Sequence, residues 1–90
     1  MSIKINIPLY LQQFTEDKEL IETEAKTIQE SLDILFSMYP DIKPKVFNKE
    51  GKLLDYVCIY HNNEFAYGDG LLAPIEDGDE YFILYVIGGG

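Results

Sequence analysis

Arginine and tryptophan are absent from this 90-residue sequence, and cysteine and histidine occur once each, as Cys58 and His61. A single cysteine excludes an internal disulfide framework, a zinc site built on cysteine pairs and a cysteine-ligated iron–sulfur cluster. A single histidine excludes a metal centre with several imidazole ligands. The sequence therefore lacks most of the side chains that enzymes use for metal or nucleophilic chemistry, and no metal site is expected.

Positive charge is also scarce, since seven lysines stand against 16 aspartates and glutamates and give a net charge of −9. Binding nucleic-acid phosphates or an anionic membrane surface requires clustered cations, so we expect neither partner. The longest strongly apolar run, residues 81–87, is far shorter than the roughly 20 residues of a membrane-spanning helix. The first seven residues lack the apolar stretch of a secretory signal. These features predict a cytoplasmic protein.

The first half of the chain predicts a hairpin followed by a helix. Alternation of apolar and polar residues indicates a strand over residues 3–9 and, less strongly, a second strand over residues 19–25. Thr27 and Glu30 have the spacing of a capping box, which marks the start of a helix, and Pro40 ends it. One face of this helix is apolar: Ile28, Leu32, Leu35, Phe36 and Tyr39.

The second half predicts strands over residues 56–61, 64–66 and 80–87, with Asn62 and Asn63 in a tight turn between the first two. A hairpin, a crossing helix and a last strand returning beside the first form the β-grasp arrangement. We therefore expect an α+β fold with a mixed four- to five-stranded sheet and one main helix on one face. Hydrophobic residues make up 47% of the chain. This content suits one domain over residues 1–87, followed by a flexible glycine tail over residues 88–90.

The three glycines that follow the last predicted strand have two interpretations. One is a frayed end, because chain termini are often disordered. The other is a substrate tail, because glycine has no side chain and its backbone can pass through a narrow channel. In the second case the carboxylate of Gly90 is the reactive group. It can attack an activated phosphate that a partner enzyme holds in line with ATP and a metal ion.

Several segments resemble the ubiquitin-like sulfur-carrier (MoaD/ThiS) family over essentially the whole chain. The main similarity is the Gly-Asp-Glu turn at residues 78–80, followed by ten residues that end in Gly89 and Gly90. Further similarities are Tyr39-Pro40 at the helix end and the strand before Asn62. Residues 47–51, 56–60 and 70–71 look more like the longer carriers of the cysteine-synthesis type than the shorter thiazole-synthesis ones.

The resemblance implies that the chain is a carrier and catalyses nothing itself. Gly90 would be adenylated by a ubiquitin-activating-type enzyme that uses ATP and magnesium, and a sulfur donor would convert the adenylate to a thiocarboxylate. The carrier would then dock on a sulfur-accepting biosynthetic enzyme, of the molybdopterin or cysteine type, and thread Gly88, Gly89 and Gly90 into its active site. No cofactor would be bound by the carrier.

The last strand is apolar on both sides, so one side must face away from the helix. The resemblance places Phe82, Leu84 and Val86 outward, as a docking surface, because an exposed apolar patch usually marks a partner site. The alternative is that residues 41–55 cover these three side chains. For Cys58 we expect a small buried hydrophobe rather than a sulfur relay, and for His61 a solvated side chain beside the turn.

The sequence is also compatible with two other functions. A ubiquitin-like protein modifier would use the same activated tail but join it to substrate lysines. A noncovalent β-grasp binding module would not need Gly89 and Gly90 at all.

Overall fold

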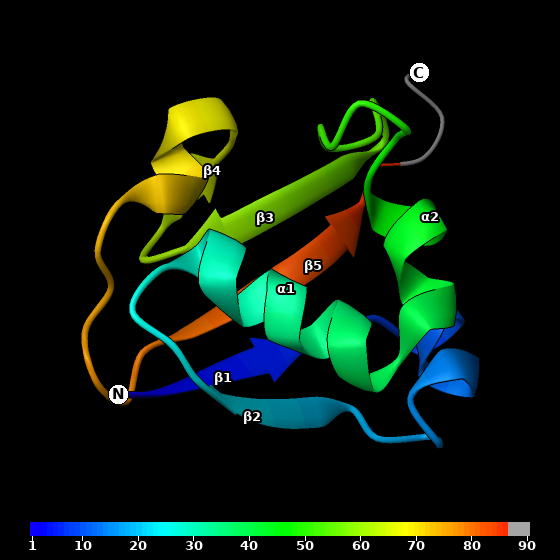
Figure 1. Ribbon diagram of the computed structural model, residues 1–90, viewed down its shortest axis with the longest axis horizontal. Coiled ribbons are helices and arrows are strands. Elements are labelled where there is room, and N and C mark those ends of the chain that lie inside the picture. The colour runs from blue at the N-terminus through cyan, green and yellow to red at the C-terminus, as the bar shows by residue number, and fades with distance from the viewer. Residues whose placement is uncertain (87–90) are drawn as a thin grey trace.

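The protein folds into a five-stranded mixed sheet with its main helix on one face (Figure 1). The computed structural model describes residues 1–86. The sheet order is β2-β1-β5-β3-β4. The strands are β1 (Ser2–Asn6), β2 (Leu20–Glu24), β3 (Val57–His61), β4 (Glu64–Ala66) and β5 (Glu80–Tyr85). The helices are α1 (Ile28–Met38), the short α2 (Lys43–Val46) and the 3-10 helices η1 (Leu9–Phe14), η2 (Pro40–Ile42) and η3 (Gly68–Leu72). The predicted β-grasp fold is confirmed.

The last strand, β5, lies at the centre of the sheet. It runs parallel to β1 on one side and antiparallel to β3 on the other, with Ile5 opposite Tyr81 and Ile59 opposite Ile83. Strand β2 pairs antiparallel with β1, as the predicted hairpin requires. The chain after β5 therefore continues from the central strand of the sheet.

The first strand is shorter than predicted. It ends at Asn6 instead of residue 9, and Leu9 is 83% exposed rather than on the inner side of the sheet. Pro8 explains the difference, because it has no amide hydrogen for the ladder. Its carbonyl instead accepts a hydrogen bond from Leu11 N at 2.9 Å, which begins η1. At the other end of the chain β5 stops at Tyr85, inside the predicted range of 80–87.

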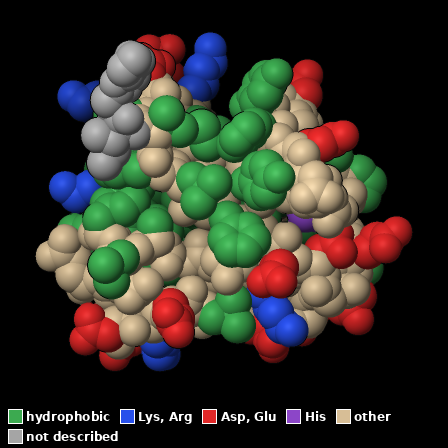
Figure 2. All heavy atoms as spheres, turned by 180° about the vertical axis from the view of Figure 1, so that it is seen from behind, with side chains coloured by type: hydrophobic (Ala, Val, Ile, Leu, Met, Phe, Trp, Pro, Cys, Tyr) green, Lys and Arg blue, Asp and Glu red, His purple; other side chains and the backbone are tan. Residues whose placement is uncertain are grey.

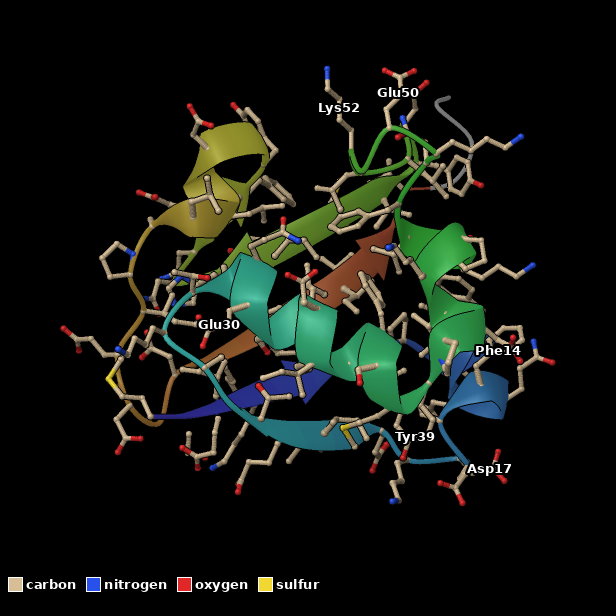
Figure 3. The ribbon with its side chains drawn as sticks, in the orientation of Figure 1. Phe14, Asp17, Glu30, Tyr39, Glu50 and Lys52 are labelled. Atoms are coloured by element: carbon tan, nitrogen blue, oxygen red, sulfur yellow. The ribbon has the colours of Figure 1, made fainter. Side chains whose placement is uncertain are left out.

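Helix α1 begins and ends as its sequence predicts. Thr27 Oγ1 accepts a hydrogen bond from the Glu30 amide at 3.0 Å, at the end of the helix where Figure 3 labels Glu30. The last helical residue is Met38, two before Pro40. Ile28, Leu32, Leu35 and Phe36 of the predicted apolar face are buried against the sheet, and Tyr39 is half-buried.

A polar group also lies in this interface. Ser31 is fully buried; its Oγ lies 2.6 Å from Thr23 Oγ1 and accepts a hydrogen bond from the Tyr81 hydroxyl at 2.9 Å. Burial raises the pKa of Tyr81, so this hydroxyl stays protonated and acts as the donor. The network connects α1, β2 and β5.

The turn between β3 and β4 matches its prediction. Asn62 and Asn63 have φ angles of 51° and 66°, the left-handed geometry of the tight hairpin turn. Over the described residues no helix is long and apolar enough to cross a membrane. The predicted boundary between body and tail, at residues 87 and 88, lies outside the described part of the chain.

Candidate functional site

The three predicted docking residues lie on the face of the sheet opposite α1. Phe82 is 40% exposed, Val86 is 52% exposed and Leu84 is half-buried, whereas Tyr81 and Ile83 between them are fully buried. Strand alternation explains this pattern, since successive side chains point to opposite faces. The predicted orientation is therefore confirmed. Gly88, Gly89 and Gly90 lie outside the described residues.

Neighbouring strands extend this exposed surface. The register of β3 and β5 places Cys58 opposite Leu84 and Tyr60 opposite Phe82. Phe65 of β4 pairs with Tyr60, and their ring centroids are 5.1 Å apart. Leu20, at the start of β2, pairs with Asn6 on the same face. We refer to this surface as the apolar patch: Leu20, Cys58, Tyr60, Phe65, Phe82, Leu84 and Val86.

Figure 2 shows hydrophobic side chains gathered over this face, with acidic side chains around them. Residues 41–55 do not cover the patch. They pack on the other side, where the Phe47 ring meets Phe36 of α1 edge-on at 5.3 Å. Sequence reasoning missed Leu20, Tyr60 and Phe65, because only the strand register shows that they share a face with Phe82.

A hollow of about 500 Å³ lies beside Phe82, where β1 ends. Its apolar lining includes Pro8, Leu20, Phe82 and Leu84. Glu19 and Glu80 also line it, and Glu80 Oε2 accepts a hydrogen bond from Asn6 Nδ2 at 2.8 Å. This combination of an apolar lining and acidic residues suits a partner's apolar side chain that has cationic groups on either side of it.

The root of the tail is held by backbone and aromatic contacts. Val86 N donates a hydrogen bond to the Tyr56 carbonyl at 2.8 Å. The Tyr85 ring stacks on Tyr10 with centroids 3.5 Å apart, and Tyr56 meets it edge-on at 5.0 Å. Burial, followed by the adjacent Tyr85, raises the pKa of Tyr10 far above its usual range. The role of Tyr10 could not be predicted from the sequence, because its stacking partner is 75 residues away.

Two predictions about single residues are wrong. Cys58 is half-buried on the outward side of β3 instead of lying in the core. The strand is apolar on both sides, so its sequence does not indicate which side faces α1. His61 is not simply solvated, because its Nε2 lies 2.9 Å from Asp79 Oδ2 and only 17% of its side chain is exposed. The described residues contain no cluster of three potential metal ligands.

Comparisons with known proteins agree with this geometry. The profile of the ThiS family matches residues 5–90. The sulfur carrier protein CysO of Mycobacterium tuberculosis is 29% identical over 93 aligned positions, which cover the whole of both chains. A chain of the crystal structure of the Amycolatopsis orientalis BexX/CysO complex is 30% identical with a TM-score of 0.83, over 98% of this chain and 99% of that one.

A third comparison concerns the fold alone. SAMP1 of Haloferax volcanii superposes with a TM-score of 0.83 over the whole of both chains, at 22% identity. The family match, by contrast, extends through the last strand and the glycine tail. The chain therefore belongs to the ThiS family, as a sulfur carrier of the ThiS/CysO type rather than a catalyst.

Proposed function

We propose that the carboxylate of Gly90 is the group that carries sulfur. A ubiquitin-activating-type partner enzyme binds ATP and magnesium, a carboxylate oxygen attacks the α-phosphorus, and pyrophosphate leaves. A sulfide equivalent from a donor then attacks the acyl carbon, and AMP leaves. The product is a thiocarboxylate, in which one oxygen of Gly90 is replaced by sulfur. The carrier supplies no catalytic group in either step.

The observation that supports this proposal most directly is the family match through residue 90. The position of β5 adds to it, because the tail follows the central strand of the sheet in the sequence. Glycine suits a tail that must enter an enclosed site, since it has no side chain and few backbone restrictions. On this proposal Gly88 and Gly89 pass through the channel of the partner and Gly90 reaches the nucleotide.

The apolar patch is proposed as the docking surface for both partners, the adenylating enzyme and the sulfur-accepting enzyme. Phe82, Leu84 and Val86 lie on the strand that leads into the tail, so docking there brings the tail to the partner's active site. Aromatic residues at the centre of such a patch provide most of the binding energy of an interface. A relative of this chain, CysO of Amycolatopsis orientalis, forms a complex with BexX.

Adenylation provides the first test. The protein is incubated with a ubiquitin-activating-type enzyme, ATP and magnesium, and exchange of labelled pyrophosphate into ATP is measured. The proposal predicts exchange that depends on the intact tail. A variant without Gly89 and Gly90 is the matched negative control. If exchange is absent with the full chain, or equal with the shortened chain, the proposal fails.

The fate of the activated tail separates the carrier from the alternatives. A thiocarboxylate that passes its sulfur to a molybdopterin- or cysteine-type synthase indicates a carrier. Isopeptide links between Gly90 and substrate lysines indicate a protein modifier. A shortened chain that supports growth as well as the full chain indicates a noncovalent binding module, which needs no tail.

A further inference from the structure

The end of β5 loses its neighbour on one side before the strand finishes. Pairing with β1 stops at Asn6 and Phe82, while pairing with β3 continues to Tyr85. The last three residues of β5 are therefore paired on the β3 side alone within the described sheet. A strand end supported on one side is free to swing, unless other contacts replace the missing neighbour.

Two tyrosines supply such contacts. Tyr10 comes from η1, which begins where Pro8 turns the chain away from the sheet, and its ring stacks on Tyr85 at 3.5 Å with 29° between the planes. Tyr56 approaches the same ring edge-on at 5.0 Å, and its carbonyl accepts the hydrogen bond from Val86 N. The edge-on contact of Tyr56 is a favourable arrangement of aromatic rings, and the Tyr10 ring lies almost directly over that of Tyr85.

The Tyr10 hydroxyl does not account for this placement. Its oxygen is buried, and the Tyr85 hydroxyl, which lies close enough to raise its pKa, does not reach hydrogen-bonding geometry. A buried hydroxyl without a partner is unfavourable. The ring contact with Tyr85, not the hydroxyl, therefore explains the position of this residue.

We propose that Tyr10 and Tyr56 form a tyrosine clamp on Tyr85 that fixes the direction of the end of β5, from which the tail continues in the sequence. The clamp residues are positioning residues for adenylation, so this inference rests on the proposed function. The apolar patch fixes the body on the partner through the outward side of β5. The clamp fixes the end of the same strand relative to that body.

The length of the tail makes this direction important. Gly90 is the fourth residue after Val86, and four extended residues span at most about 14 Å. Motion at the root adds to the freedom of the glycine backbone and widens the range of positions that the carboxylate can take. Misplacing a reacting group by about 1 Å costs about 100-fold in rate. Fixing the root therefore shortens the search of the carboxylate for the α-phosphorus.

The test compares Tyr10→Ala with Tyr10→Phe in the pyrophosphate-exchange assay. Tyr10→Ala removes the stacked ring and is expected to lower kcat at least about 10-fold while KM changes less than about 2-fold, because the patch still docks. Tyr10→Phe keeps the ring and removes only the hydroxyl, so it is expected to restore the wild-type kcat. Tyr10→Leu preserves apolar volume without stacking, and it replaces the alanine variant if that chain does not fold by circular dichroism.

Phe14→Ala provides the matched control. Phe14 is a half-buried aromatic residue on the same 3-10 helix, labelled in Figure 3, and it faces Lys45 at 5.8 Å rather than Tyr85. Its removal should leave kcat unchanged. An equal loss in Phe14→Ala, or a kcat for Tyr10→Ala and Tyr10→Leu equal to wild type, overturns the clamp. Absence of exchange with the wild-type chain contradicts the proposed function itself.

Discussion

His61 and Asp79 join the end of β3 to the turn that begins β5, with His61 Nε2 at 2.9 Å from Asp79 Oδ2. The same carboxylate oxygen accepts a hydrogen bond from the Glu76 amide at 3.1 Å, and the Asp79 carbonyl accepts one from Lys4 N at 3.0 Å. Asp79 therefore connects the turn at residues 76–79 to both neighbours of β5. The hydrogen bond from His61, followed by that from Glu76, lowers the pKa of Asp79.

This pair predicts a loss of stability in acid. A carboxyl group whose pKa is lowered on folding stabilises the protein above its unfolded-state value, near 3.9, and this contribution is lost as the pH falls through the folded-state value. Asp79→Asn should therefore cost about 1 kcal/mol at pH 7, or about 5 °C in Tm. The Tm difference from wild type should shrink as the pH is lowered to about 3.

Thermal unfolding between these pH values measures the difference. Asp69→Asn, which neutralises an exposed carboxylate in η3, is the control and should follow wild type at every pH. A Tm gap between Asp79→Asn and wild type that stays constant with pH contradicts the role of the ionised carboxylate.

A second prediction concerns the buried hydroxyl network. Ser31→Ala removes the acceptor of the Tyr81 hydroxyl and leaves that buried group unpaired, which should cost about 1–3 kcal/mol. The double variant with Tyr81→Phe should lose less stability than the two single variants lose together, because it leaves no buried donor without an acceptor. Urea unfolding measures all three. Additive losses would show that the two hydroxyls do not interact.

The docking surface makes a third prediction. Phe82→Asp places a charge at the centre of the apolar patch and should raise the KM of adenylation by about 10- to 100-fold, since central aromatic residues provide most of an interface's energy. Because Phe82 is 40% exposed, the Tm should change little. Met38→Asp, at an exposed residue of α1 on the opposite face, is the matched control and should leave KM unchanged. Equal KM values for both variants exclude the patch as the docking surface.

A fourth prediction concerns the end of the tail. One residue added after Gly90 moves the carboxylate beyond the position at which it meets the nucleotide, so pyrophosphate exchange should fall to background. Binding to the adenylating enzyme should persist, because the patch is unaltered. Isothermal titration separates the two effects. Normal exchange by the extended chain is the opposing result.

The fold could be predicted because its signals are local. The apolar face of α1, the cap at Thr27 and the turn at Asn62 each follow from residues a few positions apart. Pro8 also indicates that β1 ends nearby, because it has no amide hydrogen. The predicted strand nevertheless extended to residue 9, because the apolar and polar residues alternate through Leu9. The outward side of β5 was predicted from the family resemblance rather than from its residues, which are apolar on both sides.

The errors and omissions concern residues whose roles depend on distant partners. His61 meets Asp79, 18 positions away, and Tyr10 meets Tyr85, 75 positions away. Cys58 lies on a strand that is apolar on both sides, so only its register with Leu84 shows that it faces outward. The periodicity of apolar residues indicates which residues share a face of one helix or strand. It does not indicate what that face packs against.

The most direct test of the sulfur-carrier proposal is the mass of the C-terminal peptide from protein purified from the cells that make it. If Gly90 carries sulfur, a fraction of this peptide should be heavier by the difference between one sulfur and one oxygen atom, with the change located on Gly90. In a C-terminal peptide cut after Glu80, which excludes Cys58, treatment with an alkylating reagent for thiocarboxylates should shift that fraction alone. Two results would contradict the sulfur-carrier proposal. In one, the peptide is found entirely as the free acid in cells with an active sulfur donor; in the other, it is found joined to lysine side chains.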